Sequence, residues 1–154
     1  MRKYILHMSL LTLLFSSAVL SLAQTNQANR PALGKWQLNV EKSKSNGALP
    51  NSETVTITPD GKTAVEGVSK DGKAYSWSFI PSQGASVPIQ GMENATVVET
   101  HSGGNSVDHV WKVAGGNSKG HGVVSPDGKT MTYTQDGVDG KGSPVHVMMI
   151  FDKQ

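Results

Sequence analysis

The chain has 154 residues, of which 36% are hydrophobic and 17% are charged, and it contains no cysteine. This length predicts one domain with a single core, and the lack of cysteine excludes disulfides, zinc–thiolate sites and thiol catalysis. The formal net charge of +2 argues against a strongly basic nucleic-acid binder and against a polybasic membrane-surface protein.

The first 23 residues have the pattern of a secretory signal peptide. Arg2 and Lys3 give a positive start, residues 5–22 are mostly apolar, and Ser21-Leu22-Ala23 supplies small residues for cleavage. We expect cleavage after Ala23, which leaves no stable membrane anchor and directs the chain to the periplasm or outside the cell. A retained anchor is the alternative, although serines and a threonine dilute the apolar run. A lipoprotein is excluded because lipid attachment needs a cysteine.

Cleavage after Ala23 would lower the formal net charge of the chain and leave a polar segment at its new N-terminus. The removed segment holds two of the 14 basic residues and none of the 12 acidic ones, so the remaining chain has no formal net charge. Residues 24–33 are expected to form a flexible lead-in. Residues 34–154 are expected to form the single folded domain.

From residue 34 onward, apolar and polar residues alternate with the two-residue period of strands that bury one face. The clearest case is Tyr75, Trp77 and Phe79, which alternate with serines, and His109 shares its expected inward face with Trp111. The last run is apolar on both parities, which indicates a central strand or one buried on both faces. The expected strands span residues 34–40, 53–58, 63–69, 74–80, 95–100, 107–114, 120–125, 130–135 and 144–152.

Glycine turns separate several of these strands. Asp-Gly-Lys occurs at residues 60–62, 71–73, 127–129 and 139–141. In such turns the aspartate bonds to nearby backbone, and the glycine adopts the left-handed conformation that closes a hairpin. The similar spacing within the two pairs of turns indicates either a degenerate two-fold repeat or repeated use of one favoured turn. The chain is therefore expected to be all-β, an antiparallel up-and-down meander of about eight strands closing into a barrel, with a β-sandwich as the alternative.

Three stretches resemble a known group of proteins. They are Gly34-Lys35-Trp36 with the residues that follow to Lys44, residues 125–130, and residues 144–153. Together they are similar to small secreted bacterial lipocalin-like (calycin-type) β-barrel proteins, most of them without an assigned function. The resemblance implies an up-and-down barrel with an apolar ligand in its mouth. The late-strand arginine that packs on the first-strand tryptophan in lipocalins has no counterpart, because Arg30 is the only arginine after residue 23.

No group of residues predicts catalysis or metal binding. Residues 116–120 fit Gly-x-Ser-x-Gly, but no helix follows as a hydrolase requires, so we expect a turn there. The histidines at positions 101, 109, 121 and 146 match no short ligand motif. Glu66, Glu99 and Asp108 are expected to face solvent. We therefore expect no catalytic residue, no metal and no cofactor.

The aromatic side chains are the best candidates for binding. An eight-stranded barrel is just wide enough to be filled by side chains or to hold one small ligand. The rings either form the core or line a pocket, with residues 81–94 as a cover. The candidate ligand-binding residues are Trp36, Tyr75, Trp77, Phe79, His109, Trp111 and Tyr133.

These features favour a noncatalytic, monomeric protein that binds a small apolar or amphipathic molecule and does not bind nucleic acid. The alternative is a protein–protein interaction module of the envelope or extracellular space with a filled core. It would dock through exposed Met148 and Ile150 on the last strand. A metal-dependent or hydrolytic enzyme has the least support.

Overall fold

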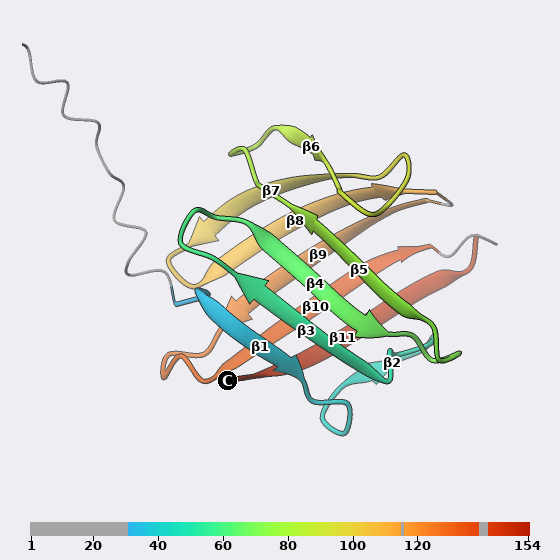
Figure 1. The fold of residues 1–154 in the computed structure, drawn as a ribbon, viewed down its shortest axis with the longest axis horizontal. Helices are drawn as coiled ribbons and strands as arrows, with labels where there is room; N and C mark the ends of the chain where they lie inside the picture. The colour runs from blue at the N-terminus through green and yellow to red at the C-terminus, as the bar shows by residue number, and fades with distance from the viewer. Residues whose placement is uncertain (1–30, 115, 139–141) are drawn as a thin grey trace, which may run out of the picture.

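The computed structural model describes residues 31–114, 116–138 and 142–154, and every regular element in them is a β-strand (Figure 1). The predicted signal peptide, the lead-in up to residue 30 and the turn at 139–141 lie outside the described residues. The strands are β1 (Gly34–Leu38), β2 (Lys44–Ser45), β3 (Ser52–Ile57), β4 (Thr63–Val68), β5 (Ala74–Phe79), β6 (Ser86–Pro88), β7 (Thr96–Gly103), β8 (Ser106–Val113), β9 (Gly116–Val124), β10 (Thr130–Val138) and β11 (Pro144–Lys153).

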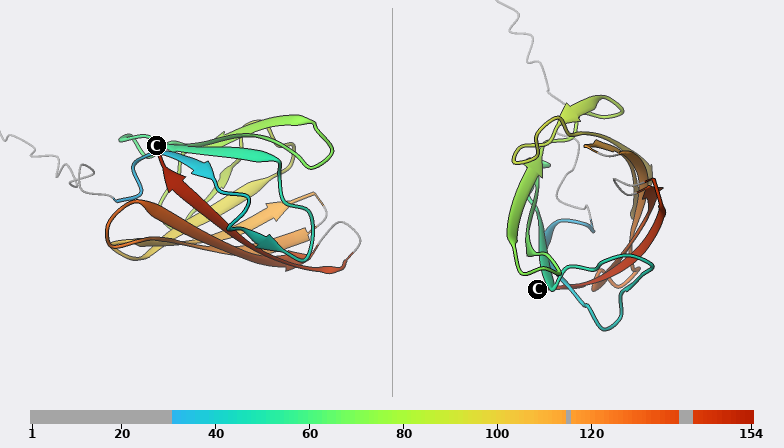
Figure 2. Two further views of the ribbon diagram at one scale, coloured as in Figure 1. Left: turned by 90° about the horizontal axis from the view of Figure 1, so that it is seen from below. Right: turned by 90° about the vertical axis from the view of Figure 1, so that its right-hand side faces the viewer.

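The strands form one antiparallel sheet that curls into a barrel. The order is β5-β4-β3-β1-β11-β10-β9-β8-β7-β6, and β2 pairs β11 beside this path. The first long strand therefore pairs the last one, with Trp36 opposite Lys153. Backbone hydrogen bonds in both directions between Ser78 and Gln90, 2.8 and 3.0 Å long, join β5 to the segment after β6. Seen end-on, the strands make a ring (Figure 2).

These observations confirm the all-β, up-and-down barrel and correct the strand count. The described residues hold eleven strands and not about eight, because the pairing adds β2 and β6. Both are only two or three residues long, so neither has room for a detectable alternation. In the described part of the chain, no helix has the length and apolar composition needed to cross a membrane.

Three of the Asp-Gly-Lys turns are built alike. Gly61, Gly72 and Gly128 have φ angles of 88°, 82° and 70°, the left-handed region that glycine adopts without strain. Each glycine N–H donates to the carbonyl of the residue three positions earlier, at 2.9 Å. That earlier residue, a serine or threonine, donates its hydroxyl to the aspartate of the same turn. The predicted left-handed glycines are confirmed, and the Lys129 N–H donates to Asp127 at 3.1 Å, an aspartate–backbone bond of the predicted kind. The hydroxyl bonds to the aspartates were not predicted.

The first strand is held by its tryptophan. Trp36 is completely buried, and its Nε1–H donates to the Ala32 carbonyl at 2.8 Å. The Nζ atom of Lys153 lies 5.0 Å from the centre of the Trp36 ring, within range of a cation–π contact. A lysine of the last strand therefore covers this ring, at the place where the sequence offers no arginine.

Two expectations about local structure are wrong. The Gly-x-Ser-x-Gly stretch is the start of strand β9 and not a turn, since it pairs in register with β8 from Val113 opposite Gly116. Glu99 is 8% exposed and faces inward, where solvent exposure was expected. The prediction for the last strand is confirmed: β11 lies in the sheet between β1 and β10, and Met148 and Ile150 are half-buried.

Candidate functional site

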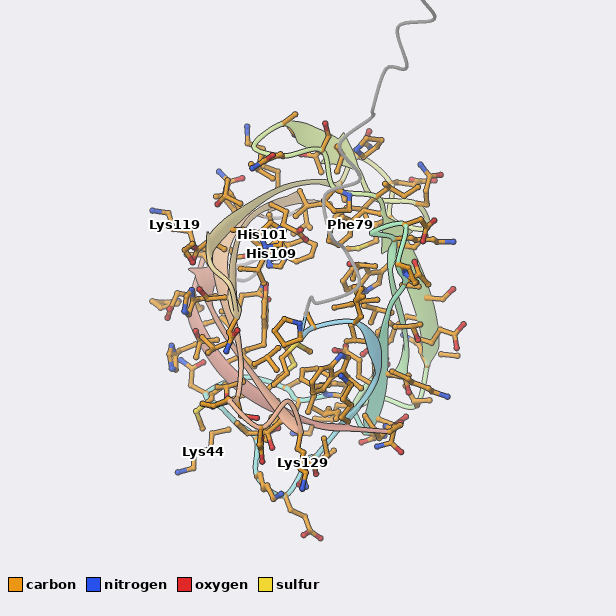
Figure 3. The ribbon with its side chains drawn as sticks, turned by 90° about the vertical axis from the view of Figure 1, so that its left-hand side faces the viewer. Lys44, Phe79, His101, His109, Lys119 and Lys129 are labelled. Atoms are coloured by element: carbon orange, nitrogen blue, oxygen red, sulfur yellow. The ribbon has the colours of Figure 1, made fainter. Side chains whose placement is uncertain are left out.

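The barrel contains a cavity of about 370 Å³. At one end of the barrel its lining includes Ala32, Gly61 of the β3–β4 turn, and Gly104 and Asn105 of the β7–β8 turn. Figure 3 looks into this end, which we call the mouth, and His101, His109 and Phe79 lie on the inner wall. The volume is near the lower limit for pockets that bind small organic molecules, so it suits one compact ligand.

Five of the seven predicted candidates line this cavity: Trp77, Phe79, His109, Trp111 and Tyr133. Trp77 and Phe79 each contact the Trp111 ring edge to face. The Trp77 and Trp111 centroids are 5.5 Å apart, and those of Phe79 and Trp111 are 5.7 Å apart. Aromatic pairs prefer this geometry, in which the positive edge of one ring meets the negative face of another. The contacts hold the rings against the wall.

The other two candidates, Trp36 and Tyr75, are not among the lining residues. Trp36 belongs to the packed cluster around β1 and β11. The Tyr75 hydroxyl donates to the Glu53 carboxylate at 2.6 Å, and Glu53 itself does line the cavity. Sequence reasoning missed the aliphatic and methionine part of the lining, which includes Val55, Ile57, Val65, Val107, Val124, Met131 and Met149.

Glycines on strand β9 make room for Tyr133. A Cβ atom built on Gly120 would lie 1.8 Å from the Tyr133 hydroxyl oxygen and 2.5 Å from its Cζ. A Cβ on Gly122 would lie 3.3 Å from the Tyr133 Cδ2. The ring therefore lies flat against the bare backbone of β9, so that it occupies little of the interior. Without these glycines the same side chain would project into the cavity.

A chain of hydrogen bonds crosses the cavity wall. The Trp111 Nε1–H donates to the Tyr133 hydroxyl oxygen at 2.7 Å, and that oxygen lies 3.5 Å from His109 Nδ1. His109 Nε2 is 3.1 Å from one oxygen of Glu99, and His101 Nε2 is 3.2 Å from the other. Burial raises the pKa of Tyr133, so its hydroxyl keeps its proton and can donate to His109. The donors then run in one direction, from indole to hydroxyl to imidazole to carboxylate.

Glu53 is the second carboxyl on the wall. Burial raises its pKa from the usual 4.5, and the hydrogen bond from Tyr75 lowers it by less. The ionisable side chains of the lining are thus two glutamates, two histidines and Tyr133. No lysine or arginine of the described residues lines the cavity, and Lys44, Lys119 and Lys129 point away from the interior (Figure 3).

Sequence reasoning missed Glu53, Glu99 and His101 as cavity residues. For Glu99 a signal existed but was ambiguous. Glu99 shares parity with Ala95 and Val97, which are both buried, yet Val98, between Val97 and Glu99, is also apolar. Adjacent valines leave the inward parity of this strand undetermined until its pairing with β8 is known.

Two further histidines, His121 and His146, form pairs on the outside of the barrel. His121 Nδ1 lies 2.6 Å from an Asp108 oxygen, and His146 Nδ1 lies 2.5 Å from an Asp136 oxygen. All four side chains are substantially exposed. Within the described ranges, no group of three or more histidine, aspartate or glutamate side chains is arranged to hold a metal ion.

The fold has relatives among solved structures. A Schistosoma mansoni fatty acid binding protein in complex with arachidonic acid superposes with a TM-score of 0.53 and 18% identity. The superposition covers 82% of this chain and 98% of the fatty acid binding protein's chain. A mutant of the fluorescent protein UnaG gives a TM-score of 0.50 and 13% identity, and the superposition covers 80% of this chain and 96% of the UnaG chain. No protein-family model and no curated protein matches the chain. At this identity the likeness establishes the fold alone, a β-barrel of the calycin type.

Proposed function

We propose that this chain binds one small, largely apolar molecule with a polar end inside its barrel, and that it acts as a carrier or receptor without catalysis. The observation that carries the proposal is the cavity of about 370 Å³ walled by Trp77, Phe79 and Trp111. A cavity of this kind, mostly apolar with a few convergent polar groups, is the usual form of a small-molecule site. One barrel of similar fold has been solved with arachidonic acid bound.

The cavity also separates this proposal from the interaction module. That alternative required a filled core and an exposed apolar stripe at Met148 and Ile150. The interior holds a cavity, and both side chains are half-buried on a strand between two others. We further propose that the chain works as a monomer in the periplasm or outside the cell after removal of residues 1–23.

A neutral fluorescent probe, N-phenyl-1-naphthylamine, tests the proposal. We expect the mature protein to bind it with a Kd of about micromolar order and with a blue-shifted emission, since the probe would enter an apolar interior. Long-chain alcohols and related amphipathic molecules should displace it.

Two tryptophan substitutions on strand β8 locate the binding. Val107 lines the cavity, whereas Val110 faces outward on the same strand and is 40% exposed. Val107→Trp should fill the cavity and abolish binding, and Val110→Trp should bind as the wild type does. Failure of the folded wild type to bind any member of a broad apolar panel would refute the proposal. Equal binding by both variants would place the probe on the outer surface.

A further inference from the structure

The charges on the cavity wall restrict the polar end of the ligand. Glu99 lines the cavity and is only 8% exposed. The basic side chains on the lining, His101 and His109, each direct Nε2 at Glu99. A carboxylate ligand would therefore find the imidazole donors already engaged. It would also be brought, poorly solvated, toward a second negative charge.

An ammonium group would meet the opposite situation. A carboxylate has about four lone-pair positions, and the histidines use one on each oxygen of Glu99, so acceptor positions remain. A buried charge needs an opposite charge and hydrogen bonds. A protonated amine and Glu99 would satisfy this need for each other.

The surrounding rings favour the same sign of charge. His109 packs between Phe79, Trp111 and Tyr133, with ring centroids 6.0, 5.1 and 5.7 Å away. The faces of Trp, Tyr and Phe rings attract cations, and ring-lined cavities with a nearby carboxylate are well suited to organic ammonium groups. The wall beside Glu99 thus combines an anion with aromatic rings, and its described residues supply no lysine or arginine.

We propose that the cavity selects an amphipathic organic cation, an amine with an apolar tail, whose ammonium group pairs with Glu99 beside the aromatic wall. This rests on the proposed function, because it assigns the ligand class of the same cavity. The tail would occupy the apolar remainder of the lining between Val55, Met131 and Phe151. The chain would thus differ in ligand charge from a barrel that takes a fatty acid.

Three ligands with the same tail test the head group directly: dodecylamine, dodecanol and dodecanoate. Each is titrated at neutral pH, below its micelle concentration, against the protein loaded with the neutral probe. We expect dodecylamine to bind at least about tenfold more tightly than dodecanol, and dodecanoate at least about tenfold more weakly. Dodecanoate binding as tightly as dodecylamine would overturn the inference.

Glu99→Gln then tests the residue assigned to the head group. The substitution keeps the shape and removes the charge, so the advantage of dodecylamine over dodecanol should fall to within about twofold. Glu66→Gln is the matched control, since Glu66 is exposed on the outer face of β4, and it should preserve the advantage. An undiminished advantage in a folded Glu99→Gln protein would overturn the assignment.

The outcomes separate the two proposals. If neither the probe nor any of the three ligands binds the wild type, the proposed function fails and the head-group inference fails with it. If the probe and dodecanol bind but dodecylamine has no advantage, only the inference fails. Should Glu99→Gln not fold, the ranking of the three head groups on the wild type still decides.

Discussion

The close approach of Tyr133 to strand β9 predicts a large effect from a single methyl group. In Gly120→Ala the added Cβ would lie 1.8 Å from the Tyr133 hydroxyl oxygen and 2.5 Å from Cζ, so the ring must leave the wall. The hydrogen bond from Trp111 to that hydroxyl, 2.7 Å long, would be broken. The displaced ring would enter the cavity and reduce its volume.

The magnitude follows from two contributions. Loss of the hydrogen bond costs about 1 kcal/mol, and overpacking in a filled wall costs about 1–3 kcal/mol. The free energy of unfolding should therefore fall by about 2–4 kcal/mol, which corresponds to a Tm decrease of about 8–16 °C for a domain of this size. Urea unfolding and thermal unfolding followed by circular dichroism measure the change.

A matched glycine and a second-site change make the result interpretable. A Cβ on Gly104 would contact nothing within 4 Å, so Gly104→Ala should leave stability nearly unchanged. Adding Tyr133→Leu to Gly120→Ala removes the clashing ring and should restore part of the lost stability. A Gly120→Ala protein with wild-type Tm and wild-type probe binding would refute the packing of Tyr133 on β9.

Three further outcomes follow from particular side chains. Trp36→Ala should lower the free energy of unfolding by about 3–5 kcal/mol in urea titrations, since this fully buried indole anchors β1. Gly61→Ala should lower the free energy of unfolding by about 1–2 kcal/mol, because φ is 88° at this position. Ala64→Gly, in strand β4, lies outside this turn and would not probe its conformation. Burial raises the folded-state pKa of Glu53 above its usual 4.5, so this group makes stability fall as pH rises from about 4.5 through the folded-state pKa. Glu53→Gln should remove that fall, and its Tm should exceed that of the wild type at neutral pH but not at pH values below 4.5.

Much of the barrel could be predicted because its determinants are local. Strand alternation and Asp-Gly-Lys turns act over a few residues, and the structure places strands within a few residues of nearly every expected run. The short strands β2 and β6 could not be predicted, because two or three residues show no alternation. They are strands only because longer neighbours, β11 and β7, offer backbone partners.

The cavity wall could be predicted in part, for a related reason. Trp77, Phe79, Trp111 and His109 lie on strands whose inward parity is plain from the residues beside them. Glu99 was missed because Val97 and Val98 are both apolar, so only pairing with His109 across β7 and β8 fixes its direction. Side-chain proximity between strands depends on register, which local sequence patterns do not specify.

Tyr133 links the shape of the cavity to its chemistry. Its ring lies flat on Gly120, which leaves space for a ligand, and its hydroxyl joins Trp111 to His109 and so to Glu99. A change in shape and a change in charge should therefore be distinguishable by ligand. Gly120→Ala moves a ring into the cavity and should weaken dodecanol and dodecylamine together. Glu99→Gln leaves that space unchanged and should alter the ratio of the two affinities, because only the ammonium group interacts with the carboxylate as a charge.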